Sequence, residues 1–261
     1  MKQVGRRQLR MEDDTLIVGA GRFVDDIQIP GMHHVVLVRS SMASALLRSV
    51  DVTAARTAPG VVAVFTAADL TERAKILPDG HPSALMKHHR GPPILAESCV
   101  RYVGEPIAAV VATDAYLAED AAELVDIEYE ALQAVVNPEK AIAAGSPLVH
   151  HDVPSNIGTQ IPVSKGDVTQ AFASAPVVVK QRVEIHRGAG GAMETRGIVA
   201  HWNTASRRMM VWNVSQVPYV QRTVIADALG LPERAVQVIN DDIGGGFGYK
   251  GLLYVEDLLI P

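Results

Sequence analysis

The chain has 261 residues, 48% of them hydrophobic and 20% charged, so it can bury the core of one large domain or of two smaller ones. The 29 acidic residues outnumber the 24 lysines and arginines, which gives a net charge of −5, and only 5% of the residues are aromatic. This composition argues against a nucleic-acid-binding protein, because such proteins carry a basic surface and aromatic side chains that stack on bases.

The single cysteine, Cys99, excludes an internal disulfide bond and fits a reducing compartment. We interpret it as a small core residue, and an iron–sulfur cluster needs more thiolates than this chain has. Residues 1–14 contain no apolar stretch typical of a signal peptide, and no apolar run is long enough to cross a membrane. The sequence therefore predicts a soluble, cytoplasmic protein.

The first half of the chain alternates short β-branched runs with short helical segments. Thr53 is expected to cap a short helix, and the spacing of Thr66 and Asp69 predicts a capping box. Predicted strands cover residues 35–39, 50–52, 61–65, 100–112 (a pair broken around 104–106) and 126–130, and residues 71–98 are expected to form a loop. This alternation predicts a compact α/β unit over the first ~135 residues.

One helix of this unit is predicted from its apolar periodicity. Residues 113–125 carry apolar side chains at helical spacing with acidic residues on the other face. The apolar positions that define the expected core face are Tyr116, Leu117, Ala121 and Leu124.

The second half begins after residues 137–158, which are rich in Pro and Gly and form the predicted linker. Asp167 is expected to cap a helix over 168–174. The remaining predictions are a long strand over 177–185, a hairpin of 198–202 with 208–214, a helix over 218–230 ended by Gly230 and Pro232, and a strand over 235–239.

This last strand leads into the segment DDIGGGFGYK, residues 241–250. Consecutive glycines let several backbone N–H groups face one anionic or strongly hydrogen-bonding ligand, such as a phosphate or a metal-bound oxygen. A tight turn between two elements accounts for the same glycines. The local sequence leaves both interpretations open.

Gly246, Gly248 and Gly251 also match the G-x-G-x-x-G spacing of dinucleotide-binding proteins. This fold needs a second strand and an acidic residue about 20 residues later, and the chain ends before that point. A nicotinamide-dependent dehydrogenase therefore stays a weaker alternative. The P-loop pattern fails, because Lys250 follows a tyrosine.

Several segments together carry a family resemblance. From about Gly19 to its last residue, the chain resembles the molybdopterin-binding large subunit of the xanthine dehydrogenase, aldehyde oxidase and carbon monoxide dehydrogenase family. The matching segments, in order, are GAGRFVDDIQIPGM, APGVVAVFTAADL, RYVGEPIAAVVA, YLAEDAAELVDIEYE, GAMETRGIVA and LGLPERAVQVINDDIGGGFGYK.

The resemblance implies the fold class α/β (α+β), with a hammerhead α/β domain followed by the beginning of a molybdenum-cofactor-binding α/β domain. The implied division is an N-terminal extension at 1–18, the hammerhead domain at 19–136, the linker at 137–158 and the incomplete cofactor domain at 159–261.

The resemblance also implies the site residues. The backbone of Gly245, Gly246, Phe247 and Gly248 would lie against the cofactor, and Gln216 would hydrogen-bond an oxo ligand of molybdenum. No residue of this chain is expected to bind the metal directly. Glu194 and Arg196, in the segment METRG, are expected to form a structural ion pair.

By this resemblance, the chain is the N-terminal part of a molybdenum hydroxylase that oxidises a small substrate with water as the oxygen source. The implied cofactor is molybdenum-molybdopterin in its cytosine dinucleotide form, with iron–sulfur clusters and FAD on partner subunits. The general base and the second cofactor domain would come from another chain. The alternative is a truncated, non-catalytic remnant or docking module without cofactor.

Overall fold

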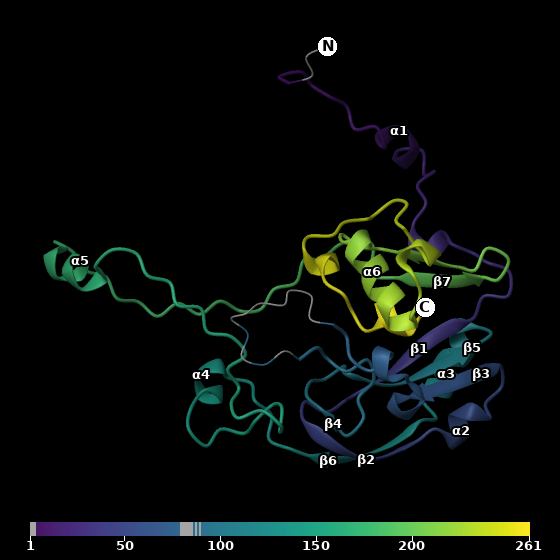
Figure 1. Cartoon of the computed structure of the whole chain (residues 1–261), viewed down its shortest axis with the longest axis horizontal. Coiled ribbons are helices and arrows are strands. Elements are labelled where there is room, and N and C mark those ends of the chain that lie inside the picture. Colours follow the sequence, from purple (N-terminus) through teal and green to yellow (C-terminus); the bar gives the residue numbers. More distant parts are fainter. Residues whose placement is uncertain (1–3, 79–85, 87, 89) are drawn as a thin grey trace.

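The structure is a computed structural model that describes residues 4–78, 86, 88 and 90–261. An N-terminal unit of two sheets packs against a C-terminal unit of one sheet, and an arm around α5 (Val168–Ser174) extends away from both (Figure 1). The mixed α/β (α+β) class predicted from the sequence is confirmed. No helix in the described part of the chain is both long and apolar enough to span a membrane.

The N-terminal unit contains two three-stranded antiparallel sheets. The first has the order β1–β5–β3, with bounds His34–Arg39, Pro106–Ala112 and Val61–Thr66. The second has the order β4–β2–β6, with bounds Cys99–Val100, Ala45–Asp51 and Asp126–Ala131. The segment predicted as one strand pair, 100–112, thus contributes one strand to each sheet, because the turn around Gly104 redirects the chain.

Helix α3 (Ala115–Ala122) packs against β1 and β5 with only part of the face that its apolar periodicity predicts: Ala121 is buried and Leu117 is half-buried. The buried residues of the helix are Ala118 and Ala121, whereas Tyr116 is 76% exposed. Small side chains allow a helix to approach a sheet closely, and Ala121 packs in one cluster with Val110 of β5 and Val64 of β3. The core face is therefore the alanine face, and the expectation for Tyr116 and Leu124 was wrong.

Two capping predictions have different outcomes. The box between Thr66 and Asp69 is confirmed, since the Thr66 N–H donates to Asp69 Oδ2 at 2.7 Å. Helix α2 (Thr53–Arg56) instead begins at the residue expected to cap it. Asp51 Oδ1 accepts the Thr53 N–H at 2.8 Å, so a carboxylate two residues earlier satisfies this amide.

The C-terminal unit is a three-stranded mixed sheet, β7–β8–β9. The predicted hairpin and the following strand are confirmed as β7 (Ile198–Asn203), β8 (Arg208–Asn213) and β9 (Val236–Ile239). The sequence also predicted α6 (Pro218–Leu229), which connects β8 to its parallel neighbour β9 and ends at Gly230 with φ +65°. The short helix α7 (Glu256–Leu259) follows the glycine run.

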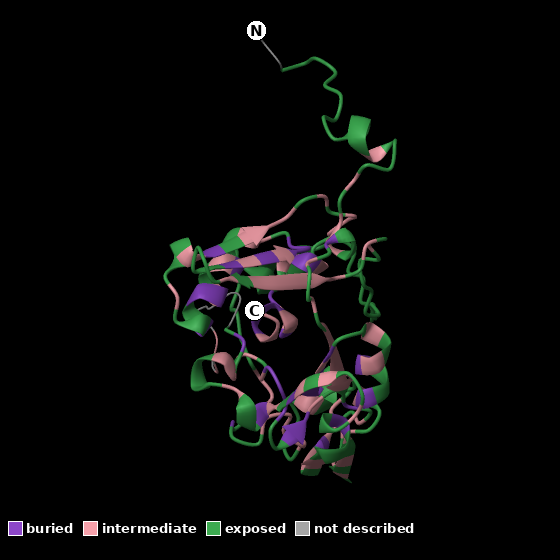
Figure 2. Ribbon diagram, turned by 90° about the vertical axis from the view of Figure 1, so that its right-hand side faces the viewer, coloured by how far each residue is buried: buried purple, intermediate pink, exposed green. Residues whose placement is uncertain are grey.

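A hydrophobic cluster joins the two units. Val211, Ile225 and Val236 of the C-terminal unit pack with Ile94 and Leu95 of the N-terminal unit. Figure 2 shows buried residues in both units, whereas the N-terminal extension is almost entirely exposed. The glycine run is thus attached to a sheet whose position relative to the N-terminal unit is fixed by packing.

Connecting segments hold the remaining short elements. They are α1 (Asp13–Leu16), α4 (Pro138–Ala141) and 3-10 turns at Val24–Asp26, Ala67–Asp69, Glu72–Ala74, Glu233–Ala235 and Tyr249–Gly251. Part of the predicted loop 71–98, namely 79–85, 87 and 89, lies outside the described residues.

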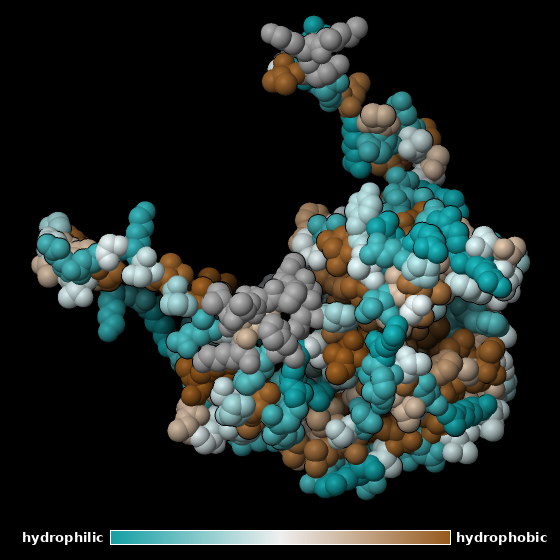
Figure 3. Space-filling model, viewed as in Figure 1, coloured by the Kyte–Doolittle hydropathy of each residue, from teal (hydrophilic) through white to brown (hydrophobic). Residues whose placement is uncertain are grey.

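The arm differs most from prediction. The cap of α5 is confirmed, because Asp167 Oδ1 accepts the Gln170 N–H at 2.9 Å. The predicted strand 177–185 is wrong, because these residues belong to no sheet and all are exposed. The arm that carries them projects away from the body of the molecule (Figure 3). A strand needs hydrogen-bonding neighbours, and this segment belongs to none of the sheets in the described part of the chain.

Candidate functional site

The glycine loop, which we define as residues 244–248, follows β9 and presents backbone rather than side chains. Gly245, Phe247 and Gly248 have positive φ values of +106°, +52° and +89°. Within the described part of the chain, the N–H groups of Gly245, Gly246 and Phe247 donate to no atom. Consecutive free amides in a loop of this kind form a concave site for an anionic or oxygen-rich ligand.

Gln216 lies beside this loop, as the resemblance implies. It follows β8, and its Oε1 accepts the Gly248 N–H at 3.0 Å. Its own backbone N–H donates to the carbonyl of Lys250 at 2.9 Å. A Cβ added to Gly246 would lie 2.6 Å from Gln216 Cδ, so this side chain occupies the space that any residue but glycine would need. The sequence-predicted site residues are therefore neighbours.

Glu194 and Lys250 were not predicted to act together, yet they support the start of the loop. Glu194 Oε2 accepts the Gly244 N–H at 2.7 Å and lies 3.2 Å from the Lys250 ammonium nitrogen. The expected ion pair of Glu194 with Arg196 is wrong, because Arg196 pairs with Glu256 instead. Residues 193 and 194 lie in a bend, so the side chains of residues 194 and 196 do not share one face as they would in a regular strand.

A second glycine segment, GAGG at 188–191, packs against the loop and was missed by sequence reasoning. A Cβ on Gly190 would lie 2.7 Å from Phe247 Cβ, and one on Gly245 would lie 3.1 Å from the Cβ of Ala192. The signal available in the sequence was the second cluster of glycines itself. Phe247, which this contact supports, is 74% exposed, so its ring faces solvent beside the free amides.

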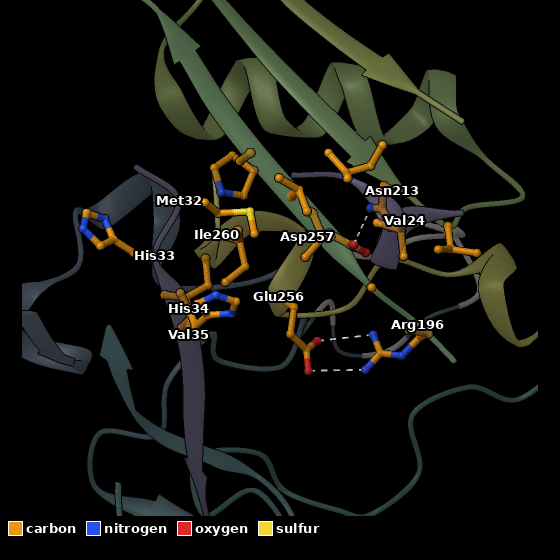
Figure 4. A pocket seen from close by; sticks show the side chains of 18 of the residues that line it. Val24, Met32, His33, His34, Val35, Arg196, Asn213, Glu256, Asp257 and Ile260 are labelled. Carbon is orange, nitrogen blue, oxygen red and sulfur yellow. Dashed lines mark hydrogen bonds and ion pairs between the residues drawn. The ribbon is translucent and has the colours of Figure 1, made fainter. Parts of the chain in front are cut away.

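A cavity of about 1010 Å³ lies between the two units, close to this site (Figure 4). Glu256 on α7 lines it and binds both units, because it accepts hydrogen bonds from Arg39 on β1 at 2.6 Å and from Arg196 at 3.3 Å. The Arg196 guanidinium also lies over the ring of Tyr254, 3.6 Å from its centre. We call Arg39, Glu256 and Arg196 the interdomain clasp.

The pKa values of two adjacent carboxylates on α7 are shifted in opposite directions. Burial alone raises the pKa of Glu256, but hydrogen bonds from Arg196 and Arg39 outweigh it and lower the pKa below its ordinary value. Burial raises the pKa of Asp257, although Tyr254 N–H and Asn213 Nδ2 donate to its oxygens. Glu256 is therefore held as an anion, and Asp257 resists ionisation.

Comparison with known proteins identifies the family of the chain. The family model of the aldehyde oxidase and xanthine dehydrogenase a/b hammerhead domain matches residues 18–133, and that of the molybdopterin cofactor-binding domain matches residues 149–261. The chain belongs to the xanthine dehydrogenase, aldehyde oxidase and carbon monoxide dehydrogenase family. The glycine loop and Gln216 both lie within its cofactor-binding domain.

Characterised members of this family match nearly the whole chain. The large subunit of nicotine 6-hydroxylase from Paenarthrobacter nicotinovorans is 37% identical over 99% of this chain and 31% of its own length. The carbon monoxide dehydrogenase large chain of Afipia carboxidovorans is 36% identical over 96% of this chain and 32% of its own length. The present chain thus spans about a third of the length of these relatives.

A solved structure of the family has the same fold. Quinoline 2-oxidoreductase from Pseudomonas putida 86 superposes with a TM-score of 0.91 at 35% identity, over 99% of this chain and 33% of that chain. The likeness extends over both units and the glycine loop, because nearly the whole of the present chain is covered.

The glycine loop fits a molybdopterin cofactor better than a nicotinamide dinucleotide. A dinucleotide-binding glycine turn opens an α-helix, whose N-terminus receives the pyrophosphate. Here the loop leads only into the 3-10 turn Tyr249–Gly251. The loop offers free amides and no Cβ at Gly245, Gly246 and Gly248, and it lies within the matched molybdopterin cofactor-binding domain.

Proposed function

We propose that the chain is the N-terminal part of the molybdopterin-binding subunit of a molybdenum hydroxylase, an oxidoreductase that oxidises a small substrate with water as the oxygen source. The observation that carries the proposal is the juxtaposition of three free backbone amides with Gln216 in a matched cofactor-binding domain. The matched relatives are large subunits of enzymes that act on nicotine and carbon monoxide, which supports a redox role.

Each group at the site has a defined part in this proposal. The amides of Gly245, Gly246 and Phe247 would donate to oxygen atoms of the bound cofactor, in its proposed cytosine dinucleotide form. Gln216 uses Oε1 to fix Gly248, which leaves its Nε2 group to donate toward the metal centre. The molybdenum cofactor, when bound, supplies the two-electron redox chemistry.

The same proposal includes partners. Iron–sulfur and FAD subunits would take the electrons, since the one cysteine here, Cys99, is buried and free. A further polypeptide segment would complete the cofactor cavity and supply the general base. The relatives are named as a large chain and a large subunit, which supports a multi-subunit assembly, and we propose that this assembly is cytoplasmic.

Metal analysis of the assembled protein tests the proposal. The chain should be purified after expression alone and after co-expression with the products of neighbouring genes, and molybdenum and pterin should be measured in both samples. We expect about one molybdenum per chain in the co-expressed assembly and little in the chain alone, because a cofactor is retained only in a complete cavity. A stable assembly without molybdenum would instead support the docking-module alternative.

A further inference from the structure

Lys250 is a cation with no access to solvent. Its residue is 1% exposed, and it has the largest side chain among those that are fully buried in the described part of the chain. Burying an ammonium group is costly unless an anion compensates it. Glu194 is that anion, with its Oε2 3.2 Å from Nζ, and its own side chain is only 12% exposed.

Glu194 is also bound to the first residue of the glycine loop at two points. Its Oε2 accepts the Gly244 N–H at 2.7 Å, and its backbone N–H donates to the Gly244 carbonyl at 3.3 Å. A Cβ on Gly244 would approach Glu194 Cβ to 2.5 Å. The carboxylate that neutralises Lys250 therefore also fixes where the loop begins.

The far end of the loop is fixed through the same lysine. Gly248 donates to Gln216 Oε1 at 3.0 Å, and Gln216 N–H donates to the Lys250 carbonyl at 2.9 Å. The contacts thus form a closed circuit from Glu194 to Gly244, along the loop to Gly248, and back through Gln216 and Lys250. The ammonium of Lys250 closes this circuit on Glu194.

We propose that Glu194 is a positioning residue that sets the distance between the loop amides and Gln216 without touching the ligand itself, and that Lys250 compensates the charge of its buried carboxylate. The inference rests on the proposed function for its ligand, the molybdenum cofactor. The coupling of Glu194 to Gly248 does not depend on that function. If the contacts of the circuit are coupled, a change at Glu194 must alter the hydrogen bonding of Gly248, which Glu194 does not contact.

Two double variants isolate the hydrogen bond from the charges. Lys250→Met with Glu194→Gln removes both charges and keeps an acceptor for Gly244, whereas Lys250→Met with Glu194→Met has nearly the same volume but no such acceptor. Neither variant leaves a buried unpaired charge, so both are expected to fold. Amide hydrogen exchange on chains labelled with 15N-glycine reports Gly244, Gly248 and, as a control, Gly104, which donates to the Ser40 carbonyl.

We call the variant with Glu194→Gln and Lys250→Met Gln/Met, and the variant with Glu194→Met and Lys250→Met Met/Met. We expect amide exchange at Gly248 to be at least ~10-fold faster in Met/Met than in Gln/Met, with the exchange rate of Gly104 unchanged within about twofold. Molybdenum content of the co-expressed assembly should fall about 10-fold or more in Met/Met and persist in Gln/Met. Equal exchange at Gly248 in both variants would overturn the proposal, and so would equal acceleration of Gly104, which indicates a role in global stability. If the unsubstituted assembly holds no molybdenum, the proposed function fails while the exchange rates still decide the coupling.

Discussion

At the scale of single residues, Gly246 and Gly251 lie on either side of Gly248, whose N–H donates to Gln216. They differ in the space that a side chain would find. A Cβ on Gly246 would lie 2.6 Å from Gln216 Cδ, whereas one on Gly251 would lie 3.9 Å from Gln216 Oε1 and touch nothing closer. Neither residue has a positive φ, so backbone strain does not separate them. They form a matched pair for testing whether the space at Gly246 matters.

Gly246→Ala should displace the Gln216 side chain and cost about 1–3 kcal/mol of unfolding free energy, the usual effect of inserting a methyl group into filled space. Gly251→Ala should change stability by no more than about 1 kcal/mol. Urea unfolding of the two variants measures this, and molybdenum content of the assembly should fall only for Gly246→Ala. Equal behaviour of the two would show that the Gln216 contact does not constrain the loop.

The family resemblance implied that Gln216 lies near the glycine loop, which the structure shows, whereas the local sequence alone left the role of the glycines open. It did not predict that Glu194 binds Lys250, since these residues are 56 positions apart and several lysines and arginines were equally available as partners. Charge partners depend on which side chains face each other across packed segments, and that is set by the tertiary fold.

At the scale of elements, the arm shows what an apolar pattern does and does not determine. Within 177–185, Val177, Val179, Val183 and Ile185 occupy every second position except that of Gln181, and the positions between them hold Val178 and three charged residues. This pattern is close to that of a strand with one buried face. All four are exposed in the structure, because the pattern specifies a face but no neighbouring strand. For α3, the helix was predictable from the sequence, but the face that it buries was predictable only in part, since Ala121 is buried and Tyr116 is exposed.

The exposed apolar face of the arm should cause self-association of the isolated chain. Val179→Lys combined with Val183→Lys should reduce it, since charges on a strand oppose edge-to-edge pairing. Analytical ultracentrifugation at several concentrations measures the effect. Val178→Lys, on the opposite, already charged face, is the control and should reduce it less; a reduction as large as that of the double variant would argue against strand pairing through the apolar face.

At the scale of the whole molecule, the interdomain clasp connects the two units through one carboxylate. The pKa of Glu256 lies below its ordinary value of 4.5, so its stabilisation is fully present above that pH and is lost as the pH falls through the lower folded-state value. Asp257 has the opposite sign, because its raised pKa makes the folded state relatively more stable as the pH falls.

Glu256→Gln should therefore lower the unfolding free energy by about 1–3 kcal/mol at pH 7, the range for hydrogen bonds to charged groups. The difference in unfolding free energy between the variant and the unsubstituted chain should shrink as the pH falls below 4.5. The contribution of Asp257 to the pH dependence cancels in this difference, because both chains contain Asp257. Urea unfolding at several pH values measures the difference. Glu233→Gln breaks the exposed pair with Arg222 and should cost less than about 1 kcal/mol at any pH; a similar loss in both variants would contradict a special role for the clasp.

The clasp also imposes an order on biosynthesis, because its two main partners, Arg39 and Glu256, are 217 residues apart. The sheets of the N-terminal unit need only residues 34–131, so they can close while the rest of the chain is still being translated. At ~10 residues per second, Arg39 then waits on the order of ten seconds for its carboxylate to leave the ribosome. Protease digestion of ribosome-bound chains stalled near residue 200 should already find this unit protected, with the wall that later receives α7 still open to chaperones.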